Sequence, residues 1–247
     1  MNFINFLENE NDYPGRSSLT LFTAGCNFNC GYCHNPELKG FKEGKISEED
    51  VWSYIIPRKD WLKSIVISGG EPTLQNDLPE FAKSAKENGL SVKLDTNGSN
   101  PSMLKRLLEE KLIDYVAMDV KAPASLYSKV IGDNFNFYNA AKESMRLAAK
   151  FPDYEFRTTV APVLINGSLK FMNSEDIFNL AREIHEITWN ENHKYFLQPF
   201  MAVKKEGGNK MYLKENLPKE MLETPKDLME SCKEQAKLWL PKTEIRN

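Results

Sequence analysis

Six short apolar runs rich in β-forming residues recur along this chain, and segments with helical periodicity separate them. Such alternation is typical of repeated βα units, in which the strands form a mostly parallel sheet and the helices pack against it. The pattern therefore predicts an α/β fold. We expect the strands near Leu19–Ala24, Ser64–Ser68, Ser91–Asp95, Tyr115–Val120, Glu155–Val160 and Tyr195–Gln198.

Start and stop signals delimit the helices between these strands. Ser47 precedes three acidic residues, as an N-cap residue precedes an acidic first turn, and Ser174 is the expected N-cap of a later helix because it again has acidic residues behind it. Gly89 suits the left-handed position that ends a helix, and Thr224 followed by Pro225 suits a helix start. Further helices are expected at Pro79–Asn88, Pro101–Glu110, Asn136–Lys150, Ser174–Ile187 and Pro225–Leu240, whereas 39–45 and 202–223 are typical of loops, the second a candidate lid.

Length and charge exclude several classes of protein. With 247 residues, of which 41% are hydrophobic, the chain can bury one sizeable core, so we expect a single domain. A net charge of -3 gives no electrostatic footprint for duplex nucleic acid. The N-terminus is acidic, and nowhere do roughly 18 apolar residues run together. The sequence therefore predicts a cytosolic protein without a membrane segment.

Three of the four cysteines lie in one short run, Cys26, Cys30 and Cys33, spaced as C-x3-C-x2-C. Three thiolates on one loop can bind three irons of a cubane cluster and leave the fourth iron open, since a cluster normally takes one Cys per iron. The alternative is a zinc site that adds His34. Zinc sites usually use two separated ligand pairs, however, and Cys232 lies near the far end of the chain. The loop therefore favours a cluster.

Cys232, His185 and His193 are not expected to belong to the functional site. Helical spacing puts Cys232 on one face with Leu228, Ala236 and Trp239, which predicts a buried, inert thiol. His185 and His193 lie on or beyond an expected helix, and we expect both to face solvent.

Polar residues follow three of the expected strands. They are the runs Ser68-Gly-Gly-Glu-Pro-Thr-Leu-Gln75, Leu94-Asp-Thr-Asn-Gly98 and Met118-Asp-Val-Lys121. A strand-to-helix turn, helix N-capping or solvated charges would explain each run separately. Barrel folds, however, place their functional sites at the C-terminal ends of successive parallel strands.

The run Cys26-Asn-Phe-Asn-Cys30-Gly-Tyr-Cys33 resembles the radical S-adenosylmethionine motif, in which an aromatic residue, here Tyr32, precedes the third Cys. The following His34-Asn35-Pro36 resembles the continuation found in activating enzymes of glycyl radical proteins. The resemblance covers about 19–200. It implies a partial (β/α)6 TIM-like barrel, a single domain 1–247 with its core at about 19–200, and a C-terminal loop and helix at 201–247.

The same resemblance implies the cofactors and the residues that hold them. One 4Fe–4S cluster would bind Cys26, Cys30 and Cys33, and its open iron would bind S-adenosylmethionine. A monovalent cation near Asp95 and Asp119 is a further expectation, and no protein residue beyond cluster and cofactor would be catalytic. The implied cofactor-binding residues are Tyr32, His34, Gly69, Gly70 and Glu71 (the last three at the methionine amino group), then Asp95, Thr96, Asn97, Asp119, Lys121 and Arg157.

The resemblance also implies a reaction. The reduced cluster would cleave S-adenosylmethionine, and the resulting 5′-deoxyadenosyl radical would take a hydrogen from a glycine of a partner protein. The expected partner is anaerobic ribonucleoside-triphosphate reductase, with flavodoxin or ferredoxin as electron donor. Three alternatives stay open: a pyruvate formate-lyase-type activase, a small-molecule enzyme such as 7-carboxy-7-deazaguanine synthase, and a metal protein without catalysis. The chain has no extra cysteines between the cysteine loop and Gly69, so one cluster is expected.

Overall fold

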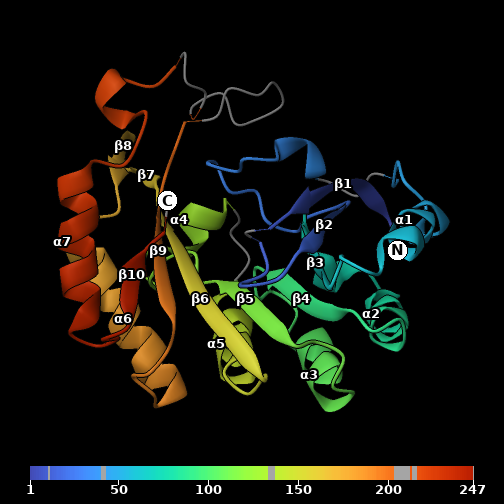
Figure 1. Cartoon of the computed structure of the whole chain (residues 1–247). Coiled ribbons are helices and arrows are strands. Elements are labelled where there is room, and N and C mark those ends of the chain that lie inside the picture. Colours follow the sequence, from blue (N-terminus) through green and yellow to red (C-terminus); the bar gives the residue numbers. More distant parts are fainter. Residues whose placement is uncertain (11, 40–42, 133–136, 203–211, 213–215, 247) are drawn as a thin grey trace.

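An open eight-stranded sheet with helices along its outer side forms the body of the molecule (Figure 1). The computed structural model describes residues 1–247 except 11, 40–42, 133–136, 203–211, 213–215 and 247. The sheet runs in the order β1-β2-β3-β4-β5-β6-β9-β10, and only β1 is antiparallel to its neighbour. The strands are β1 Phe3–Asn9, β2 Ser18–Thr23, β3 Ser64–Gly69, β4 Ser91–Thr96, β5 Tyr115–Asp119, β6 Asp153–Val160, β9 Tyr195–Pro199 and β10 Thr243–Ile245.

The six expected strands are confirmed as β2 to β6 and β9. The sequence did not predict β1, β10 or a separate antiparallel hairpin, β7 Pro162–Ile165 with β8 Ser168–Phe171. Asn166 and Gly167 link the hairpin strands, both at positive φ (50° and 79°). An Asn-Gly pair between apolar residues is the usual signal of such a hairpin, so this element was readable in the sequence.

The helices lie close to their expected positions. They are α1 Glu48–Ile55, α2 Leu78–Glu87, α3 Pro101–Glu109, α4 Tyr127–Ile131, α5 Tyr138–Ala148, α6 Ser174–Thr188 and α7 Lys226–Lys237, and only the short α4 was not expected. Short 3-10 turns occur at Pro36–Leu38, Ile56–Arg58, Pro72–Leu74 and Lys219–Met221. Among the described residues, no helix is long and apolar enough to cross a membrane.

Two of the three expected caps differ from the structure. Ser47 caps α1 as expected, accepting a hydrogen bond from the backbone N–H of Asp50. At α6 the cap is Asn173, because its longer side chain reaches the backbone of Asp176. Thr224 does not cap α7, since its hydroxyl accepts from the N–H of Phe200 and donates to the carbonyl of Val160 instead.

The core has two parts. The larger part lies between the sheet and the helices, where Ile65, Ile67 and Leu94 are fully buried. A smaller cluster of Tyr13, Val66, Tyr115 and Ala117 faces the other way. Because side chains alternate along a strand, Val66 points to the opposite face of the sheet from its neighbours Ile65 and Ile67. Tyr13, from the β1–β2 loop, packs on this face against Tyr115, with ring centroids 5.9 Å apart.

Candidate functional site

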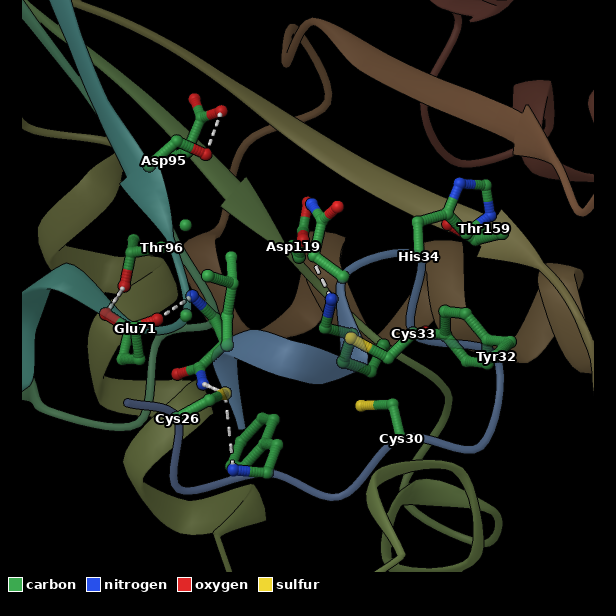
Figure 2. Close-up of a pocket in the computed structure, with 18 of the residues that line it drawn as sticks. Cys26, Cys30, Tyr32, Cys33, His34, Glu71, Asp95, Thr96, Asp119 and Thr159 are labelled. Atoms are coloured by element: carbon green, nitrogen blue, oxygen red, sulfur yellow. Dashed lines mark hydrogen bonds and ion pairs between the residues drawn. The ribbon is translucent and has the colours of Figure 1, made fainter. Parts of the chain in front are cut away.

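A cavity of about 310 Å³ opens at the C-terminal ends of the parallel strands. Its wall is built by the loop after β2 and by the ends of β3, β4, β5, β6 and β9 (Figure 2). Every residue that the sequence singled out for metal or cofactor binding lines it: Cys26, Cys30, Tyr32, Cys33, His34, Gly69, Gly70, Glu71, Asp95, Thr96, Asn97, Asp119, Lys121 and Arg157. The topology thus brings together residues that span 131 positions, from 26 to 157.

Other residues of the cavity wall were not foreseen as site residues. Phe28 and Leu38 supply apolar surface, and Lys39 and Thr159 supply polar groups. Lys39 lies six residues after Cys33, and nothing in a sequence shows which way such a loop folds back. Gln198 and Pro199 at the end of β9 also line the cavity.

The three cysteines of the loop are free thiols that point toward a common space in Figure 2. Cys30 is 7% exposed, and burial raises the pKa of its thiol. Burial also raises the pKa of the Cys26 thiol to about 12. Bare thiolates are therefore disfavoured here, and the positive charge of bound iron would compensate them.

The donor set fits a cubane cluster better than a single ion. Within the described parts of the chain, no three His, Cys, Asp or Glu side chains lie close enough to share one metal ion. A cubane has a different requirement, because each thiolate binds its own iron. The Tyr32 hydroxyl, buried in the cavity wall, has no hydrogen-bond partner among the described residues. An unpaired buried hydroxyl is costly and indicates space for a polar ligand.

Charged side chains from neighbouring strands form one ion-pair network at the other wall. The Arg157 guanidinium contacts Asp119 (Nε to Oδ1, 2.9 Å) and Asp95 (Nη1 to Oδ2, 3.5 Å). Lys121 contacts the second oxygen of Asp119 at 2.7 Å, and Lys93 contacts Asp95 at 3.1 Å. Burial alone would raise the pKa of Asp119, but Arg157 and Lys121 outweigh it and hold that pKa at about 2. Both carboxylates are therefore ionised and fixed in place.

This network bears on the expected monovalent cation. Arg157 already touches both carboxylates that would bind such an ion. A cation between Asp95 and Asp119 would have to share them with the guanidinium. The cation and the contact between Arg157 and the cofactor both stay predictions.

Glu71 joins the turn after β3 to the end of β4. It is fully buried, and its carboxylate accepts from the backbone N–H of Thr73, the hydroxyls of Thr73 and Thr96, and the backbone N–H of Asn97 (2.6 Å). Burial raises the pKa of Glu71, and these donors partly offset the effect. The structure thus gives Glu71 an organising role, while its expected contact with the methionine amino group stays a prediction.

Glycines allow the turn after β3 to touch the cysteine loop. The N–H of Glu71 donates to the carbonyl of Gly25 at 2.8 Å. A Cβ on Gly70 would lie 1.8 Å from that same carbonyl oxygen, and one on Gly69, at φ +115°, would lie 2.2 Å from the backbone nitrogen of Thr23. Only glycine permits this approach of the two chain segments.

The candidate lid at 202–223 lies mostly outside the described residues. Tyr212 is described, is buried, and donates its hydroxyl to the carbonyl of Pro162 at 2.9 Å. A Cβ on Gly31 would lie 2.2 Å from its ring. Tyr212 therefore packs directly on the cysteine loop, between Cys30 and Cys33.

Cys232, His193 and His185, which were not expected in the functional site, are not among the residues that line the cavity. Cys232 is fully buried, as expected. The expectation that His193 faces solvent was wrong, because its ring is fully buried and bonded to Tyr154 and Thr188. His185 is half-buried and packs on Trp239, with ring centroids 5.4 Å apart.

The model of the Radical SAM superfamily matches residues 20–184, more than half of the chain. The protein therefore belongs to the radical SAM superfamily and is an enzyme. Its cofactors are a 4Fe–4S cluster and S-adenosylmethionine. Cys26, Cys30 and Cys33 line the cavity, and their binding of the cluster stays a prediction.

Within the superfamily, the chain is similar in sequence to three kinds of enzyme. The chain is 40% identical over 184 residues to a candidate glycyl-radical enzyme activating enzyme of Methanocaldococcus jannaschii, covering 71% of each protein. It is 28% identical over 206 residues to 7-carboxy-7-deazaguanine synthase of Clostridium acetobutylicum, covering 73% of this chain and 90% of that one. With the pyruvate formate-lyase-activating enzyme of Staphylococcus aureus it shares 34% identity over 123 residues, 44% of this chain and 48% of that one.

Among solved structures, methylornithine synthase shares the fold. Its TM-score is 0.58 at 16% identity, covering 96% of this chain and 66% of that one. The partial TIM-like barrel predicted from the sequence is thus confirmed as the fold class, with a mostly parallel sheet flanked by helices.

Proposed function

We propose that this radical SAM enzyme activates a glycyl radical protein, and that its partner is anaerobic ribonucleoside-triphosphate reductase. The observation that carries the proposal is the 40% identity, over 71% of both chains, to the candidate activating enzyme of Methanocaldococcus jannaschii. The run His34-Asn35-Pro36 and the strand-end runs at Asp95 and Asp119 support the same assignment. All three runs face the single cavity described above.

The chain's own residues prepare the cavity for this reaction. When bound and reduced, the cluster supplies one electron for the cleavage of S-adenosylmethionine. Asp95, Asp119 and Arg157 form a charged wall whose geometry is already fixed by ion pairs, so little reorganisation is needed when a charged ligand binds. Phe28 and Leu38 give the cavity apolar surface that excludes water. The residues thus hold and orient the cofactor.

The glycine would reach the cavity as part of an extended loop of the partner. A loop would enter where the cavity opens at the C-terminal ends of the strands. The same opening would admit a small molecule. The choice of partner rests on the single cysteine triad of the described motif. An external donor such as flavodoxin or ferredoxin would supply the electron.

A second candidate is 7-carboxy-7-deazaguanine synthase. The observation in its favour is coverage, since this chain matches 90% of that relative's length. The sequence identity to this synthase is 28%, however, which is lower than the 40% identity to the candidate activating enzyme of Methanocaldococcus jannaschii. A pyruvate formate-lyase-type activase is the third candidate, and its relative matches 44% of this chain.

The test is the formation of a glycyl radical. The iron-loaded, reduced protein is mixed anaerobically with S-adenosylmethionine and the ribonucleotide reductase of the same organism, and the radical is measured by electron paramagnetic resonance. We expect a glycyl signal with the wild type and none with Cys30→Ala. A signal on a pyruvate formate-lyase alone would move the assignment to that activase. Accumulation of 7-carboxy-7-deazaguanine in cells that overproduce the protein, with no glycyl signal, would contradict the proposal.

A further inference from the structure

Lys39 reaches back from the end of the cysteine loop to its middle. It follows the 3-10 turn Pro36–Leu38 and lines the cavity. Its ammonium group donates to the carbonyl oxygen of Cys30 at 2.7 Å and to Oδ1 of Asn29 at 3.1 Å. Cys30 carries the most deeply buried of the three thiols. Lys39 therefore contacts the backbone of a cluster ligand directly.

Backbone contacts hold the rest of the loop and define what Lys39 adds. The N–H of Gly25 donates to the carbonyl of Leu38 at 3.0 Å, which joins the start of the loop to its end. The N–H of Asn29 donates to the carbonyl of Ile131 at 2.8 Å, which fastens the loop to the end of α4. The Cys30 carbonyl accepts from the N–H of Cys33 at 3.3 Å, and the Lys39 ammonium adds a shorter, charged side-chain contact to the same oxygen.

The Lys39 contacts also place a positive charge beside Cys30. Both acceptors are neutral oxygens, so these two hydrogen bonds do not cancel the charge. The other lysine of the cavity, Lys121, shares its charge with Asp119 at 2.7 Å. The Lys39 charge lies 2.7 Å from the carbonyl oxygen of Cys30, within the same residue that carries the thiol.

We propose that Lys39 is a positioning residue of the cluster site, which fixes the backbone of Cys30 and raises the reduction potential of the cluster through its positive charge. Reduction adds one negative charge to the cluster, and a nearby cation stabilises the reduced form most where water is largely excluded. The role of Lys39 concerns the cluster alone and holds for any partner protein.

The test is the midpoint potential of the cluster after anaerobic reconstitution, measured by redox titration and electron paramagnetic resonance, together with iron bound per protein. Lys39→Met removes the charge and the donor, Lys39→Gln keeps a neutral donor, and Lys39→Arg keeps both. Lys83→Met is the matched control, because it removes one exposed lysine from α2.

We expect Lys39→Met and Lys39→Gln to titrate at a lower potential than the wild type, and Lys39→Arg and Lys83→Met to titrate with it. If both neutral variants bind no iron while Lys39→Arg binds it normally, the charge is required to form the site, in agreement with the proposal. An unchanged potential in iron-loaded Lys39→Met would overturn it. So would a failure of Lys39→Arg to bind iron.

Discussion

At the scale of single residues, charge pairing decides how the site is built. Asp95 and Asp119 would be poor ions if they were buried alone, and removing one partner of a buried pair is strongly destabilising. Arg157, Lys93 and Lys121 supply that pairing from three neighbouring segments of the sheet. The sequence identified Lys121 and Arg157 but neither Lys93 nor the mutual contacts, because pairing depends on strand order, which no single motif contains.

His193 is a buried but neutral side chain, and it too depends on having partners for its polar atoms. The Thr188 hydroxyl donates to the carbonyl of Ile184 at 2.7 Å and therefore accepts from Nε2–H of His193, also at 2.7 Å. Nδ1 is then free to accept from the Tyr154 hydroxyl at 2.8 Å. The neutral ring is fully satisfied, and burial lowers the pKa of His193 from 6.5 to about 4.

This predicts a pH dependence of stability. Because the folded pKa is below the unfolded one, the stabilisation is complete above about pH 6.5 and is lost as the pH falls toward 4. At pH 5 the loss amounts to about 2 kcal/mol, since one pKa unit corresponds to about 1.4 kcal/mol. Chemical unfolding at pH 7.5 and 5 should therefore show a smaller difference for His193→Gln than for the wild type. Equal pH dependence of the wild type and His193→Gln would show that His193 is not held neutral by the fold.

At the scale of elements, the turn after β3 and the cysteine loop form one unit. The two segments meet at Gly25 and Gly70, where a Cβ would lie 1.8 Å from a backbone oxygen. Backbone atoms cannot yield as a flexible side chain can. The contact therefore transmits any change in the turn to the cysteines.

Gly70→Ala should separate these segments and lower iron binding severalfold after anaerobic reconstitution. Gly89→Ala is the matched control, because a Cβ there meets nothing within 4 Å and only the φ of +79° is strained. That strain costs about 1 kcal/mol, so Gly89→Ala should bind iron as the wild type does. Normal iron binding by Gly70→Ala would mean that the two segments can part without harm to the site.

Two of the strands that were not predicted, β1 and β10, have no sequence signal of their own. In β1 only Phe3 is buried, so the strand depends on pairing with β2 rather than on an apolar run. β10 has three residues, and Arg246 beyond it holds Glu155 through two hydrogen bonds of 2.7 and 2.9 Å. Such tertiary contacts are invisible locally. The central strands were predictable because a buried parallel strand is apolar along its whole length.

At the scale of the whole molecule, parallel strands explain why the site could be read from the sequence. Residues after each strand must meet at one edge of a parallel sheet, so the motifs converge whatever the details of the helices. Lys39 and Tyr212 could not be found this way, because both reach the cysteines through loops. The packing of Tyr13 against Val66, Tyr115 and Ala117 was also unpredictable, since one aromatic residue in a loop forms no pattern.

The most direct test of the account is cleavage of S-adenosylmethionine by the purified protein. The chain is loaded with iron and sulfide without oxygen, reduced with dithionite and supplied with S-adenosylmethionine, and 5′-deoxyadenosine is quantified. The account predicts 5′-deoxyadenosine from the wild type and from Cys232→Ala, whose thiol lies in the core, and none from Cys30→Ala. Stoichiometric zinc without iron, or no 5′-deoxyadenosine from the iron-loaded wild type, would contradict it.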